Sequence, residues 1–160
     1  MLVEPIILIS TIIITSILLW LYIPRSKLLD AHISFLFMQA QTWLLGAIVV
    51  ELHLIEYPYR FVKYAYRISF VYEYFIYPAI SALFNVHFPQ KKGWKVKTIY
   101  VFSYASVLTV IEVILEKYTY VIKYIHWYWY WTWISLVITL LISYFYYLWF
   151  YKKWVKDKET

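Results

Sequence analysis

The stretch LVEPIILISTIIITSILLWLYI, residues 2–23, decides the fold class of this chain. Glu4 is its only charge, Pro24 follows it, and it is as long as an α-helix must be to cross the hydrocarbon core of a bilayer. Similar stretches with few or no charges follow at residues 31–50, 68–88, 98–115 and 129–150. We therefore expect an all-α integral membrane protein in which a bundle of five transmembrane helices forms one domain over residues 1–160.

The composition excludes several classes of site and partner. Hydrophobic residues make up 64% of the chain and charged residues only 15%, against about 25% in soluble domains. The absence of cysteine excludes disulfides, thiolate nucleophiles and thiolate metal ligands. The net charge of +6 suits basic loops that face anionic lipid, and no separate basic domain exists to bind nucleic acid. The expected partners are membrane lipids, and nucleic acid is not among them.

The basic residues predict the orientation of the five spans. If the spans alternate in direction, ten of the fifteen Lys and Arg residues share one side: Arg25, Lys27, Lys91, Lys92, Lys95, Lys97, Lys152, Lys153, Lys156 and Lys158. The other side holds the remaining five: Arg60, Lys63, Arg67, Lys117 and Lys123. Because cytoplasmic loops carry an excess of Lys and Arg, this bias predicts an N-terminus outside and a cytoplasmic C-terminus.

The connection between the second and third spans has an unusual sequence. The segment ELHLIEYPYRFVKYAYR, residues 51–67, is aromatic, charged and amphipathic, and it is too long for a tight turn. Two structures fit this pattern: an extension of the second span, or a short amphipathic helix that lies in the membrane interface.

Polar and small residues of the second span fall on one helical face at about 100° per residue. The central members of this face are Gln39, Thr42 and Gly46, and His32 and His53 lie on the same face nearer its ends. In a membrane, such a face packs on other helices rather than on lipid. We therefore predict a helix-packing surface here, used either within the chain or against a partner.

Acidic residues inside the predicted spans are the main candidates for a functional site. Glu112 and Glu116 lie on one face of the fourth span, and Glu73 lies at a similar depth in the third span, in the outer half of the membrane. A carboxylate that faces lipid is costly, so Glu73 and Glu112 should face the bundle interior or water. Two interpretations remain: ion pairs with outer basic residues such as Arg60 or Lys123, or a proton or cation site.

Other chemistry has less support in the sequence. His53, Glu56 and His126 have side chains that zinc accepts as ligands, but their spacing matches no zinc signature such as HExxH. The histidines lie near the ends of the spans, which disfavours haem. With only Gly46 and Gly93, the chain has no Walker or Rossmann motif, and it has no GxSxG elbow. We expect no cofactor and no enzymatic activity.

Four features of the C-terminal half occur together: the basic turn FPQKKGWK (88–95), Glu112, the aromatic run HWYWYWTW (126–133) and the ending YYLWFYKK (146–153). The aromatic runs are typical of belts at membrane interfaces. Together the four features resemble a family of small, uncharacterised multi-span membrane proteins of spore-forming Firmicutes, named after a clostridial hypothetical protein. The resemblance implies a bacterial plasma membrane and about five spans. It assigns no catalytic residue, and Glu112 is the acid that matches the family pattern.

The expected function is that of a small structural or accessory subunit of a bacterial membrane assembly, whose candidate partners are another membrane protein or a second copy of the chain. The first alternative is transport of a proton, a cation or a small solute through an outer-half acidic site at Glu73, Glu112 and Glu116. The second alternative is a membrane enzyme that modifies lipids, with His53, Glu56 and His126 as its candidate residues.

Overall fold

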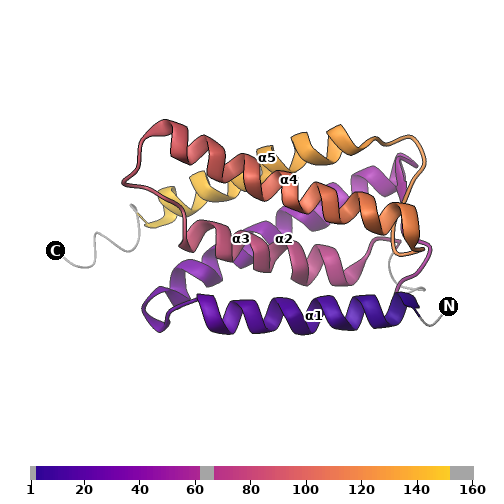
Figure 1. The fold of residues 1–160 in the computed structure, drawn as a ribbon, viewed down its shortest axis with the longest axis horizontal. Coiled ribbons are helices and arrows are strands. Elements are labelled where there is room, and N and C mark those ends of the chain that lie inside the picture. The colour runs from indigo at the N-terminus through magenta and orange to yellow at the C-terminus, as the bar shows by residue number, and fades with distance from the viewer. Residues whose placement is uncertain (1–2, 62–66, 152–160) are drawn as a thin grey trace.

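The computed structural model describes residues 3–61 and 67–151, which fold into a bundle of helices (Figure 1). In chain order the elements are α1 (Val3–Tyr22), the 3-10 helix η1 (Arg25–Lys27), α2 (Leu28–Glu51), β1 (Ile55–Glu56), the π-helical turn η2 (Tyr72–Ile76), α3 (Tyr77–Val86), α4 (Trp94–Tyr118), β2 (Lys123–Tyr124) and α5 (Trp129–Phe150). Within these residues the fold is all-helical apart from two short strands, which confirms the predicted all-α class.

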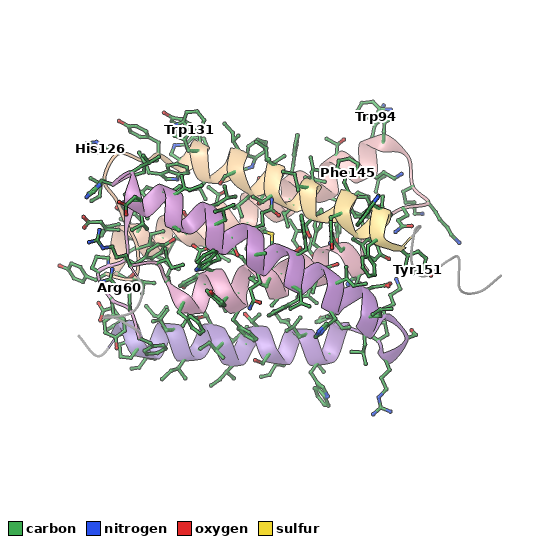
Figure 2. All side chains as sticks on the ribbon, turned by 180° about the vertical axis from the view of Figure 1, so that it is seen from behind. Arg60, Trp94, His126, Trp131, Phe145 and Tyr151 are labelled. Atoms are coloured by element: carbon green, nitrogen blue, oxygen red, sulfur yellow. The ribbon has the colours of Figure 1, made fainter. Side chains whose placement is uncertain are left out.

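Successive helices run in opposite directions along the long axis of the bundle (Figure 1). One end carries the connections from α2 to α3 and from α4 to α5, and we call it the hairpin end. The opposite end carries η1 and the turn from α3 to α4, and we call it the basic end. Figure 2 shows Arg60 and His126 at the hairpin end, and Trp94 and Tyr151 at the basic end.

The helices α2 and α3 lie at the centre of the bundle. α2 packs against α3, η2 and α5, while α1 packs against α3 and η2, and α4 packs against α5. Toward the basic end, a cluster of buried side chains joins α3, α4 and α5: Phe84, Val101, Leu140, Tyr144 and Tyr147. The hydroxyl groups of Ser81 on α3 and Ser143 on α5 share a 2.7 Å hydrogen bond that ties these two helices together.

Within the described residues, four helical segments are long and apolar enough to cross a membrane: Val3–Tyr22, Arg25–Glu51, Trp94–Tyr118 and Trp129–Phe150. Each overlaps one of the predicted spans 2–23, 31–50, 98–115 and 129–150. Their outer faces expose large apolar side chains, among them Ile13, Ile99 and Ile138. An apolar surface of this extent suits lipid rather than water, so the architecture supports a protein that crosses a membrane several times.

The third predicted span, residues 68–88, differs from a regular α-helix. It begins at Phe70, opens into the π-helical turn η2, and continues as α3 only to Val86. Pro78, in the first turn of α3, has no N–H group to donate to the carbonyl oxygen of Tyr74, four residues earlier. A proline and a π-helical turn at the same place interrupt the hydrogen-bond ladder. The structure therefore has four long apolar helices and a shorter, interrupted third segment.

The described part of the connection after α2 is neither an extension of α2 nor an interfacial helix. Strand β1 pairs antiparallel with β2, with Ile55 opposite Tyr124 and Glu56 opposite Lys123. His53, in the preceding turn, has a φ of 53° and allows the chain to reverse direction at the end of α2. Both predicted structures were therefore wrong for residues 52–61, while residues 62–66 lie outside the described residues. The two connections of the hairpin end form one small structured cap.

Candidate functional site: two buried carboxylates near the hairpin end

Glu112, on α4, is buried, and three hydroxyl groups donate hydrogen bonds to its carboxylate. Tyr77 of α3 donates to Oε2 at 2.8 Å, while Tyr124 of β2 and Thr132 of α5 donate to Oε1 at 2.6 and 2.8 Å. The indole N–H of Trp127 in turn donates to the Thr132 hydroxyl at 2.8 Å. Because the donors come from three other elements, Glu112 lies at a junction that fixes its carboxylate in one position.

Glu73, on η2, is the second buried acid of the hairpin half of the bundle. The Tyr57 hydroxyl donates a 3.0 Å hydrogen bond to its Oε1. Its carboxylate also lies directly against the backbone of α2 at Gly46, where an added Cβ would be 2.9 Å from the Glu73 Cδ atom. A Cβ atom at position 46 would force this carboxylate to shift, so Gly46 provides the space that Glu73 occupies.

The polar face of α2 supports the interrupted segment that carries Glu73. The Gln39 amide donates to the carbonyl oxygen of Tyr74 at 2.8 Å, and this is the carbonyl that Pro78 leaves without its usual partner. The Thr42 hydroxyl donates to the carbonyl oxygen of Glu73 at 2.7 Å. Together with Gly46, these residues bring the predicted helix-packing face of α2 against η2, within the chain.

Glu73 and Glu112 line a common cavity of about 170 Å³ between α2, η2, α4 and α5. Tyr57, Tyr77 and Thr132 line the same cavity, so the groups around it are carboxylates, hydroxyls and apolar side chains. One water molecule takes up about 30 Å³ of liquid volume, so a space of this size admits a few waters or a small cation.

Lys123 and Arg60, at the hairpin end, contact groups other than the two buried carboxylates. Lys123 lies 4.0 Å from Glu116 Oε1 and also donates to the Glu116 carbonyl oxygen, and Arg60 donates to the carbonyl oxygen of Arg67. Among the described residues, neither Glu73 nor Glu112 forms an ion pair with a basic side chain. The ion-pair interpretation therefore applies to Glu116, which is set apart from the two buried acids, and Lys63 lies outside the described residues.

Two of the tyrosine donors lie in the connections of the hairpin end, outside the spanning helices. Burial, and then the negative charge of Glu73, raises the pKa of Tyr57 well above its ordinary value. Burial, and then the charge of Glu112, likewise raises the pKa of Tyr124. Both hydroxyl groups therefore keep their protons at physiological pH and act as hydrogen-bond donors to the carboxylates.

The residues considered for a metal site lie at the surface of the hairpin end. His53, Glu56 and His126 are all exposed, and the His53 ring contacts the carbonyl oxygen of Glu51. Within residues 3–61 and 67–151, no group of three or more His, Cys, Asp or Glu side chains is placed to hold a metal ion. The structure thus does not bring these three residues together as ligands.

The hydroxyl donors of the site were not identified from the sequence. Tyr57, Tyr77 and Tyr124 are three of nineteen tyrosines, and nothing in their local sequence separates them from tyrosines at a membrane interface. Thr132 interrupts the aromatic run HWYWYWTW, which is a weak signal for a polar role. Pro78 carried more information, because a proline five residues after a buried acid predicts a freed carbonyl group near that acid.

No family model, no curated protein and no solved structure matches this chain. The resemblance to the clostridial family therefore stays a prediction.

Proposed function

We propose that this chain is a multi-pass protein of a bacterial plasma membrane that binds and transports a proton or a small cation at a site between Glu73 and Glu112. One observation carries the proposal. The two carboxylates are buried at one cavity, and within the described residues no basic side chain forms an ion pair with either. Two such carboxylates are stabilised together only when a proton or a cation offsets part of their charge.

The oxygen-only character of the site favours protons and hard cations. Carboxylate and hydroxyl oxygens are the candidate ligands at the cavity, and its lining among the described residues includes no histidine or cysteine. Hard cations prefer oxygen ligands, and a carboxyl group can carry a proton directly. The hydroxyls of Tyr77 and Thr132 hold the Glu112 carboxylate in place while the charge beside it changes.

The proposal includes five spans, with the third formed by η2 and α3. Residues 70–86 cover about 25 Å at 1.5 Å per residue, which is close to the thickness of the hydrocarbon core. α1, α2 and α5 all pack against α3. An interrupted helix is tolerated at membrane depth when other helices surround it and satisfy its backbone. Gln39 and Thr42 satisfy two of these backbone carbonyl groups.

The proposed orientation places the basic end in the cytoplasm and the hairpin end outside, because Lys and Arg are concentrated on the cytoplasmic side of membrane proteins. Glu112 lies six residues before Tyr118, the last residue of α4, and therefore about 9 Å from the outer end of that helix. The site then lies in the outer half of the bilayer and exchanges its proton or cation with the outside.

The expected role as an accessory subunit stays a prediction without added support. It drew on the polar face of α2 as a surface for a partner. In the structure Gln39, Thr42 and Gly46 of that face contact η2 of the same chain. The proposed function therefore rests on the acidic site.

Ion flux through purified protein in liposomes tests the proposal. Liposomes that contain a pH-sensitive, Na⁺-sensitive or K⁺-sensitive dye are exposed to a jump in the corresponding ion outside. The wild-type protein should carry one of these ions, and Glu73→Gln and Glu112→Gln should reduce its flux to that of protein-free liposomes. Both substitutions keep the shape of the side chain and remove its charge.

Glu116→Gln is the matched control. Glu116 lies one turn from Glu112 on the same helix but pairs with Lys123 and lies apart from the cavity. Its substitution should leave the flux unchanged. Equal flux through wild type, Glu73→Gln and Glu112→Gln, or no flux of any of the three ions through the wild type, would contradict the proposal.

A further inference from the structure

We propose that the cation accepted by Glu112 is the protonated amine head of a single-chain amphiphile, whose hydrocarbon tail lies in a groove between α1 and α4. This inference rests on the proposed function, because it names the class of substrate that the same site takes.

The groove has a volume of about 780 Å³. Its walls are one face of α1 and one face of α4, and α3 forms its floor. Apolar side chains cover most of it, among them Ile14 and Leu18, Ile80 and Leu83, and Leu108 and Ile111. The residues recur at intervals of three or four along each helix, so the groove follows the helix axes.

The length of the groove suits a hydrocarbon chain. On α1 its lining extends from Thr11 to Tyr22, and on α4 from Tyr100 to Leu115. At 1.5 Å per residue these distances are about 16 and 22 Å. One leaflet of the hydrocarbon core is about 15 Å thick, so the groove accommodates the tail of a membrane amphiphile over its full length.

Toward the hairpin end, the groove reaches the carboxylate site. Glu112, Tyr57 and Tyr77 line both the groove and the small cavity that contains Glu73, so they separate the two spaces. Oε2 of Glu112 accepts one hydrogen bond, from Tyr77, whereas Oε1 accepts two. Because a carboxylate oxygen can accept two hydrogen bonds, Oε2 has capacity for a further donor on the groove side.

Charge complementarity selects an amine head. Glu112 has no ion pair with a basic side chain in the described residues, and an apolar channel leads to it. A protonated amine supplies both the missing positive charge and an N–H donor for Oε2. A neutral alcohol supplies only the donor, and an anionic head is repelled.

The volume of the groove is that of a small-molecule site. A volume of 780 Å³ falls within the range of about 300–1,000 Å³ that is typical of such sites. Together with the acid that the groove reaches, this size favours one chain-shaped molecule with a cationic head as the occupant.

Photolabelling in lipid nanodiscs tests this inference. Two probes are compared, dodecylamine and dodecanol, each with a diazirine in its chain, and the labelled residues are mapped by mass spectrometry. The amine should label the facing sides of α1 and α4, around Leu18 and Leu108. It should do so about tenfold more than the alcohol, the ratio expected for one charge-assisted hydrogen bond. Glu112→Gln should remove this preference.

Leu108→Trp fills the groove without touching the charge, and it should abolish labelling by the amine. Val110→Trp is its matched control, because Val110 is 58% exposed on the same helix and lies outside the groove. Equal labelling by amine and alcohol, or labelling that persists in Leu108→Trp, would overturn the inference. Crosslinks between two copies of the chain through α1 and α4 would also overturn it, because a second copy would then cover the groove.

The two proposals can fail separately. Flux that depends on Glu73 and Glu112, without selective labelling by dodecylamine, would leave the proposed function in place and remove the amine as its substrate. Selective labelling that depends on Glu112, without flux of any ion, would establish the amine site and remove ion transport.

Discussion

At the scale of single residues, Gly46 and Thr132 show how the chain holds two acids inside an apolar bundle. Gly46 gives the Glu73 carboxylate room against α2, and Thr132 gives the Glu112 carboxylate a hydroxyl donor from α5. A buried polar group without such a partner costs about 1–3 kcal/mol, and a buried charge costs more. The identity of these two residues is therefore set by the acids that they contact.

Gly46→Ala should destabilise the protein and disturb the Glu73 site. Its Cβ atom would lie 2.9 Å from the Glu73 Cδ atom, and overpacking of this kind typically costs about 1–3 kcal/mol. Thermal unfolding in detergent measures the effect. Gly93→Ala is the control, because an added Cβ there meets no atom within 4 Å. Equal melting temperatures for the two variants would contradict the close contact.

Thr132→Val should destabilise the protein by about 1–3 kcal/mol, because it removes a donor from a buried carboxylate and keeps the side-chain shape. Thr139→Val is the matched control on α5, since the Thr139 hydroxyl donates to the Leu136 carbonyl of its own helix. A double-mutant cycle supplies the specific test. In a Glu112→Gln background the cost of Thr132→Val should fall, and an unchanged cost would show that the two side chains are not coupled.

At the scale of elements, the interrupted third segment and the polar face of α2 form one unit. Pro78 removes a backbone donor at the start of α3, η2 opens the helix, and the Gln39 amide satisfies the Tyr74 carbonyl that is left. The same opening places Glu73 against α2, where the Thr42 hydroxyl donates to its carbonyl oxygen and Gly46 leaves space for its carboxylate. A regular α-helix from residues 68 to 88 would not need these three side chains.

Gln39→Leu should cost about 1–3 kcal/mol, because the Tyr74 carbonyl would remain buried without a donor. Gln41→Leu is the control, because Gln41 lies two residues further along α2 and points to roughly the opposite side of the helix. It should cost less, because the described residues give the Gln41 Oε1 atom no hydrogen-bond partner. Combination with Pro78→Ala restores a backbone N–H near Tyr74 and should reduce the cost of Gln39→Leu. Chemical denaturation in mixed micelles measures all four variants. If Pro78→Ala leaves the loss of stability in Gln39→Leu unchanged, the Gln39 amide does not replace the backbone donor that Pro78 removes.

At the scale of the whole molecule, the sequence predicted most of the helices and part of the site. Long apolar runs identify α1, α2, α4 and α5, because a run of about twenty uncharged residues is typical of a membrane-spanning helix. The two-residue strands and η2 could not be predicted, since they depend on contacts between distant segments. Glu73 and Glu112 could be identified from the sequence because a charge in a span is costly. Their hydroxyl partners could not, because the order of the helices around the bundle decides which hydroxyl groups lie near each acid.

The orientation of the bundle is testable because the chain contains no cysteine. Single cysteines at Ser26 or Gly93, at the basic end, and at Glu56 or His126, at the hairpin end, provide unique labelling sites. A maleimide reagent that cannot cross the membrane, added to intact cells, should label only Glu56→Cys and His126→Cys. Labelling of Ser26→Cys or Gly93→Cys in intact cells would reverse the proposed orientation.

The most direct test of the central claim is difference infrared spectroscopy of the purified protein during a pH or cation titration. The C=O stretch of a protonated carboxyl group reports the proton that we propose Glu73 and Glu112 share. We predict a band of this kind that changes when a proton or a cation is exchanged, and that disappears in both Glu73→Gln and Glu112→Gln but persists in Glu116→Gln. A wild-type spectrum without such a band under any condition, or a band unchanged in both variants, would contradict a proton or cation site between the two carboxylates.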